Sequence, residues 1–91
     1  MKLRHAICLQ KIEAIPKWTL ENDRISRSFA FDSFMDAIAF INAIAPLAEK
    51  ADHHPEIFNV YNRVDLVLTT HDCQGLSEKD FKLASQIDLL L

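Results

Sequence analysis

The chain has 91 residues and a net charge of −3, and 49% of its residues are apolar. This length predicts one domain, residues 1–91, with a thin core that disulfides, a metal or self-association could reinforce. The basic residues form no cluster, which excludes direct electrostatic binding of nucleic acid, and no apolar run approaches the roughly 20 residues that span a membrane.

The first elements in the chain are predicted to be a helix and a β-hairpin. Residues 2–14 carry apolar side chains at helical spacing, and Pro16 ends this helix because the residue before a proline avoids helical geometry. Residues 17–21 and 25–31 alternate between polar and apolar side chains around a short polar turn, as paired strands do. Arg27 interrupts the apolar face, which suggests a position near an edge of the sheet.

A long helix is predicted to follow the hairpin. Asp32 or Ser33 can cap its start, and apolar residues at helical spacing carry it to about residue 51. Pro46 lies inside this pattern and removes one backbone hydrogen bond. We therefore expect a kink near residues 42–46.

The second half predicts another hairpin and a last helix. Residues 57–61 and 63–70 read as strands joined by a tight turn, and alternation turns His71 away from the face that packs on the core. Ser77 and Asp80 form a capping box that starts the final helix. Two aromatic residues are expected to pack in the core or on the sheet, namely Trp18 and Tyr61.

The predicted order is α-β-β-α-β-β-α. This order favours an α+β fold, a four-stranded antiparallel sheet with three helices packed on one face. The other face of the sheet has no predicted cover within the chain. Its polar residues suit water or a ligand, and they are Ser26, Ser28, Asp65 and Thr69.

Residues 49–55, Glu-Lys-Ala-Asp-His-His-Pro, concentrate the ionisable groups of the chain. Imidazole titrates near pH 6.5, so His53 and His54, together with His71, can exchange protons near neutral pH. Glu49 lies four residues before His53, and on a continuous helix its carboxylate would orient that ring.

Two other interpretations remain open on these residues alone. Three imidazoles and a carboxylate are chemically adequate ligands for zinc, although the spacing lacks the usual ligand pairs. Alternatively, the histidines are polar surface residues at a loop and a strand end, and capping alone explains Asp80.

These residues, at these spacings, resemble the signature of the pterin-4a-carbinolamine dehydratases. The resemblance extends from about Trp18 to Ile87, and its motif runs Glu49-x3-His53-His54-Pro55-x5-Tyr61-x9-His71-x8-Asp80. It implies the fold predicted above and an enzyme, a hydro-lyase. The implied reaction dehydrates 4a-hydroxytetrahydropterin (for example 4a-hydroxytetrahydrobiopterin) to the quinonoid dihydropterin, which recycles a pterin cofactor.

The resemblance also implies the site. Its catalytic residues would be His53, His54 and His71. Its substrate-binding residues would be Glu49, Asp52, Thr69, Thr70, Asp72 and Asp80, of which Glu49 and Asp80 are supporting acids. No metal and no bound cofactor is implied, since the pterin is the substrate.

The partners implied are the pterin carbinolamine and further copies of the chain, as a homodimer or homotetramer. Animal members also act as dimerisation cofactors for a homeodomain transcription factor, so the alternative function is a non-catalytic interaction module on the same fold. The two cysteines, Cys8 and Cys73, have no disulfide-framework spacing and no secretory signal precedes them, which predicts a cytoplasmic protein.

Overall fold

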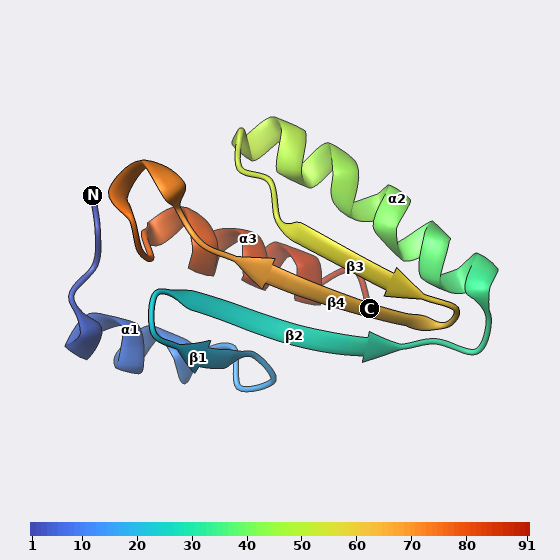
Figure 1. Ribbon diagram of the computed structural model, residues 1–91, viewed down its shortest axis with the longest axis horizontal. Coiled ribbons are helices and arrows are strands. Elements are labelled where there is room, and N and C mark those ends of the chain that lie inside the picture. The colour runs from blue at the N-terminus through green and yellow to red at the C-terminus, as the bar shows by residue number, and fades with distance from the viewer.

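The computed structural model, which describes residues 1–91, confirms the predicted order of helices and strands (Figure 1). The elements are α1 (His5–Ile12), β1 (Thr19–Glu21), β2 (Arg24–Ala30), α2 (Phe34–Ala51), β3 (Glu56–Val60), β4 (Arg63–Leu68), the 3₁₀ turn η1 (His71–Cys73) and α3 (Glu78–Asp88). The four strands form one antiparallel sheet in the order β1-β2-β4-β3. No helix is both long enough and apolar enough to cross a membrane.

Alternation along β4 places one of its faces on the core. Val64, Leu66 and Leu68 are fully buried, whereas Asp65 and Val67 on the opposite face are partly exposed. The buried face meets apolar residues from all three helices, including Cys8, Ala37, Phe40, Ile44, Leu83, Ala84 and Ile87. The hydrophobic core therefore lies between the sheet and the helices, and the other sheet face stays open.

Arg27 does not lie at an edge of the sheet, which corrects the prediction. It belongs to β2, and β2 is paired on both sides, with β1 and with β4. Its guanidinium donates to Asp88 over 2.6 Å and lies 4.3 Å from the centre of the Phe29 ring. An ion pair and an aromatic ring thus accommodate the charge on the core-facing side.

The long helix α2 begins and ends with clear local signals. The hydroxyl of Ser33 accepts the N–H of Asp36 over 3.1 Å, which confirms Ser33 as the cap. Asp52 ends the helix in the left-handed conformation, with φ of 49°. The helix is continuous through Pro46, whose side chain is exposed. The kink near residues 42–46 stays a prediction.

Two other expectations at strand ends were wrong. Tyr61 takes the left-handed conformation in the turn between β3 and β4 and is 64% exposed, so it packs neither in the core nor on the sheet. Strand β4 ends at Leu68, and His71 begins the turn η1 instead of ending a strand. Trp18 is buried, as predicted.

Candidate active site

Two turns at the same end of the molecule position the histidines. Because Asp52 is left-handed, the chain folds back at the end of α2, and the N–H of His53 bonds the carbonyl of Ala48 over 3.1 Å. After β4, Thr70 and Gly75 pair through two backbone bonds of 2.8 and 3.3 Å. These bonds close a tight loop, and His71 lies within it.

The two turns form the walls of one polar pocket of about 240 Å³. It is lined by Asp52, His53, His54, Thr69, Thr70, His71, Asp72 and Lys79. Seven of the nine residues predicted from the sequence are in this set, and the three histidines are brought together. Glu49 and Asp80 do not line the pocket. No group of three histidine, cysteine or acidic side chains lies close enough together to hold one metal ion.

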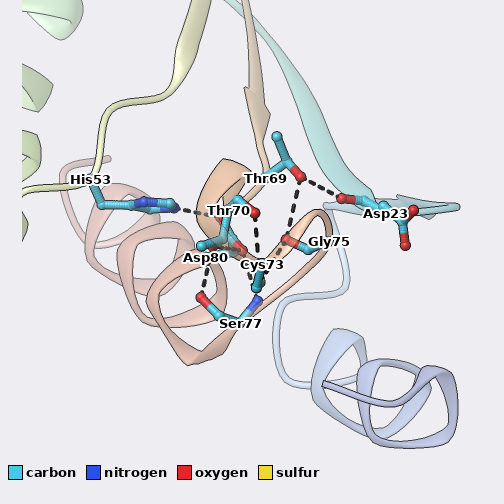
Figure 2. A network of polar contacts seen from close by, with 8 residues as sticks. All are labelled: Asp23, His53, Thr69, Thr70, Cys73, Gly75, Ser77 and Asp80. Carbon is cyan, nitrogen blue, oxygen red and sulfur yellow. Dashed lines mark hydrogen bonds and ion pairs between the residues drawn. The ribbon is translucent and has the colours of Figure 1, made fainter. Parts of the chain in front are cut away.

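The imidazole of His53 contacts the carboxyl group of Asp80. Its Nε2 atom lies 2.5 Å from Oδ1 of Asp80, a carboxyl group that is completely buried. The other oxygen, Oδ2, accepts the hydroxyl of Thr70 over 2.7 Å and the N–H of Ser77 over 3.0 Å (Figure 2). The latter bond belongs to the predicted capping box, so one carboxylate starts α3 and orients an imidazole.

The surroundings of Asp80 favour one tautomer of His53. Oδ2 of Asp80 accepts two hydrogen bonds, and when the carboxyl group is ionised its Oδ1 is also an acceptor, so that Nε2–H of His53 is the donor. The Nδ1 atom bonds no protein group, and the structure contains no buried side-chain nitrogen or oxygen without a partner. Nδ1 is therefore accessible, and in the neutral ring it carries the free lone pair.

Glu49 pairs with His54 and not with His53, which corrects the expectation drawn from helical spacing. The carboxylate Oε1 lies 2.6 Å from Nε2 of His54, and both side chains are more than half exposed. The reason is the left-handed Asp52, which ends the helix before His53, so that the ring of His53 meets Asp80 of α3 instead. Exposed ion pairs contribute little to stability, so this contact orients His54 only loosely.

The ring of His71 has no hydrogen-bond partner within the protein, and the residue is exposed. Its backbone is better fixed, because its carbonyl accepts the N–H of Gln74 over 3.1 Å and Gln74 closes the turn with φ of 57°. The pocket thus contains one imidazole that is held by a buried acid and one that is free to rotate.

Lys79 is the one lining residue that the sequence reasoning missed. Lys79 lies between Ser77 and Asp80, the two residues of the predicted capping box. Since Asp80 was predicted to belong to the site, its neighbour in the chain could have been expected there too. With Asp52 and Asp72 it makes the pocket strongly polar, and no hydrophobic residue lines it.

Comparison with known proteins gives a consistent result. A family model described as pterin 4 alpha carbinolamine dehydratase matches residues 1–90. A protein of Chloroflexus aurantiacus, whose name assigns it provisionally to the pterin-4-alpha-carbinolamine dehydratases, is 49% identical over 90 residues, which cover 99% of this chain and 97% of that protein.

Two solved structures are also similar. A crystal structure described as a transcriptional coactivator/pterin dehydratase from Brucella melitensis has a TM-score of 0.95 and 38% identity, covering 99% of this chain and 98% of that one. A pterin dehydratase-like protein, described as a RuBisCO assembly factor in the alpha-carboxysome, has a TM-score of 0.66 and 26% identity, covering 80% of this chain and 84% of that one.

Proposed function

Because the chain belongs to the pterin 4 alpha carbinolamine dehydratase family, we propose that it is a hydro-lyase that removes water from 4a-hydroxytetrahydropterin. The product is the quinonoid dihydropterin, and the reaction returns a spent pterin to its cofactor cycle. The proposal includes no metal and no resident cofactor. The observation that carries it is the pocket that His53 and His71 share, in which a buried carboxylate orients one of them.

The reaction needs one acid and one base. Hydroxide leaves C4a slowly unless the leaving oxygen is protonated while the carbon–oxygen bond breaks, and the N5 lone pair assists from the ring. The resulting cation then loses a ring proton to a base. One proton is given and one is taken, so two imidazoles that differ in protonation state balance the step.

We assign the base to His53 and the acid to His71. The contact between Asp80 and His53 keeps the proton on Nε2 and leaves the lone pair of Nδ1 available, which is what a base requires. The exposed His71 ring is free to take a proton from water and deliver it to the leaving oxygen. His54, which Glu49 contacts, mainly holds the pterin in this assignment.

The remaining lining residues are assigned to substrate binding. The carboxylates of Asp52 and Asp72 can accept N–H groups of the pterin ring. Thr69 already donates its hydroxyl to the carbonyl of Asp23 over 2.6 Å, and Thr70 donates to Asp80. These two threonines therefore offer lone pairs or backbone atoms. Glu49 and Asp80 act through the histidines as supporting acids.

The test is a stopped-flow measurement of carbinolamine decay with and without the protein. We expect His53→Ala and His71→Ala each to lower kcat by about 10²- to 10⁴-fold, and His54→Ala to raise KM more than it lowers kcat. His5→Ala is the matched control, because His5 lies outside the pocket. Loss of turnover in His54→Ala together with loss of affinity alone in His53→Ala would reverse the roles.

The second candidate function is an interaction module without catalysis. It is favoured by the description of one structural relative as an assembly factor and of another as a coactivator. An unaccelerated carbinolamine decay would put this function first.

Two further features belong to the proposal. We expect a homodimer or homotetramer, because the edge strand β3 exposes Ile57, Phe58 and Val60. We also expect a cytoplasmic protein, in which Cys8 and Cys73 remain free thiols, as they are in the structure.

A further inference from the structure

A second hollow, which we call the lysine groove, lies between the end of α2 and the start of α3. It has a volume of about 420 Å³ and is lined by Leu47, Lys50, Ala51, Lys79, Lys82, Leu83 and Gln86. Its apolar residues come from both helices, and Leu83 is almost fully buried. The groove is therefore an apolar floor surrounded by three ammonium groups and one amide.

The positive charge of this groove is not neutralised within the protein. No acidic residue lines it, and none of the six ion pairs in the structure uses one of its lysines. Lys79 also occupies the first turn of α3, where the helix dipole disfavours a cation. Helix stability therefore does not account for a lysine at this position.

The lysine groove adjoins the pocket that holds the histidines. Lys79 lines both hollows. Ala51 lines the groove, and the next residue in the chain, Asp52, lines the pocket. A molecule bound in the pocket would therefore reach the groove by extending past Lys79.

We propose that the lysine groove binds the anionic end of the side chain of the pterin substrate. This inference rests on the proposed function and names its substrate class: pterins whose side chain ends in a phosphate or a carboxylate. The ammonium groups of Lys50, Lys79 and Lys82 would donate to that anion. The apolar floor would contact the carbon atoms that link it to the ring. The two carboxylates of the pocket, Asp52 and Asp72, repel an anion there and so favour one direction of binding.

The experiment compares three carbinolamines, with a neutral hydroxylated side chain, a phosphate ester and a glutamyl side chain. We expect kcat/KM to be higher for at least one anionic substrate than for the neutral one, and the phosphate and carboxylate arms identify the preferred anion. Lys50→Gln and Lys82→Gln should each lower the anionic-to-neutral ratio roughly five- to tenfold. Added salt should lower this ratio too.

Lys17→Gln is the matched control, because Lys17 is exposed and lines neither hollow. Glutamine is also a good helix former, so the variants in α2 and α3 should fold. A ratio that is unchanged in both groove variants would overturn the inference, and a change in oligomeric mass with no change in ratio would assign the lysines to a subunit contact instead.

The same experiment separates the two proposals. If the neutral carbinolamine is accelerated and the anionic ones gain nothing from the lysines, the groove inference fails and the dehydratase proposal stands. If no carbinolamine is accelerated, the dehydratase proposal fails. Fluorescence titration with the phosphorylated dihydropterin then tests whether the lysine groove binds the anion. Binding that does not depend on Lys50 and Lys82 would overturn the groove inference.

Discussion

Asp80 links the start of α3 to the orientation of the His53 ring. Its Oδ2 atom faces only donors, from Thr70 and Ser77, and its Oδ1 atom faces Nε2 of the imidazole. The hydroxyl of Ser77 lies 2.7 Å from that of Thr70, and Thr70 donates to Asp80, so Ser77 donates to Thr70. With an ionised Asp80, the ring nitrogen of His53 that faces this carboxylate carries the proton, and that nitrogen is Nε2.

We predict that Asp80→Asn will fold but will lose most of its turnover. The amide oxygen must face the N–H of Ser77, so the NH₂ group faces His53 and forces the proton of the ring onto Nδ1. The base is then lost, and kcat should fall about 10²- to 10⁴-fold while KM changes little. Nitrogen-15 NMR of the imidazole should report the changed tautomer, which a purely structural role of Asp80 would not produce. Asp32→Asn, at an exposed site, is the control, and a tautomer unchanged from the parent would contradict the assignment.

Asp65 provides a pH-dependent contribution to stability outside the site. Hydrogen bonds from Arg63, of 2.6 and 3.1 Å, and from its cross-strand neighbour Ser28 hold the pKa of Asp65 below its ordinary value of 3.8. A carboxylate with a lowered pKa stabilises the fold above the pKa of the unfolded chain and loses that effect as the pH falls through the folded value.

We therefore expect Asp65→Asn to lower the thermal midpoint slightly at pH 7, because the pair with Arg63 is exposed. The difference from the parent protein should shrink as the pH is lowered below 3.8. Thermal unfolding followed by circular dichroism at several pH values measures this. A difference that grows on acidification would show that the pair is not the source.

For individual residues, the family resemblance predicted seven of the side chains that line the pocket, but not how the ionisable groups pair. Helical spacing assigned Glu49 to His53, whereas its carboxylate contacts His54. The partner was decided by the left-handed conformation of Asp52, which helical periodicity does not encode. Lys79 was missed because a lysine inside a capping segment looks like an ordinary surface residue.

Among the elements, α3 is attached to the sheet by polar contacts at its end as well as by its apolar face. Asp88, in the last turn, accepts the indole N–H of Trp18 over 2.9 Å and the guanidinium of Arg27 over 2.6 Å. The side chain of Arg27 is only 12% exposed. This carboxylate thus neutralises a charge that the sheet holds close to the core.

We predict that Asp88→Ala will destabilise the fold by about 2–4 kcal/mol, because Arg27 and the indole N–H would lose their partner. Urea unfolding measures the change, and Asp32→Ala, which removes an exposed carboxylate with no partner, is the control and should be nearly neutral. A loss below about 0.5 kcal/mol would mean that water replaces the carboxylate.

The type and order of the elements could be predicted because their apolar side chains repeat at helical or strand spacing, and because α2 and α3 each begin at a capping residue. The ends of the strands could not, since Leu68 and the two threonines that follow it continue the same alternation although the ladder stops. The sequence pattern also could not place Arg27 in an inner strand. A charged residue on an apolar face suggests an edge until its partner, 61 positions later in the chain, is known.

For the molecule as a whole, the two edges of the sheet differ. At one edge lies β1, which is short and contacts α1, and at the other edge lies β3 (Figure 1). Phe58 and Val60 of β3 are each 54% exposed. An open edge strand with apolar side chains invites pairing with another chain. The thin core of so small a domain gains from such pairing.

We therefore expect Phe58→Lys to reduce the molar mass in solution, as measured by light scattering after size-exclusion chromatography. A lysine on an edge strand opposes strand pairing through its charge and hydration. Thr19→Lys, on the exposed opposite edge, is the control and should keep the parent mass. A parent protein that is already monomeric at micromolar concentration would refute self-association through β3.

Asp80 belongs to the last helix that the chain forms, while the imidazole it holds comes from residue 53. A ribosome that has released everything up to β4 has therefore produced both strands of the second hairpin and two of the three rings, but not the acid that aligns one of them. Turnover should appear only when α3 has emerged and docked. Activity measured during translation would then report the docking of this helix, not the arrival of the histidines.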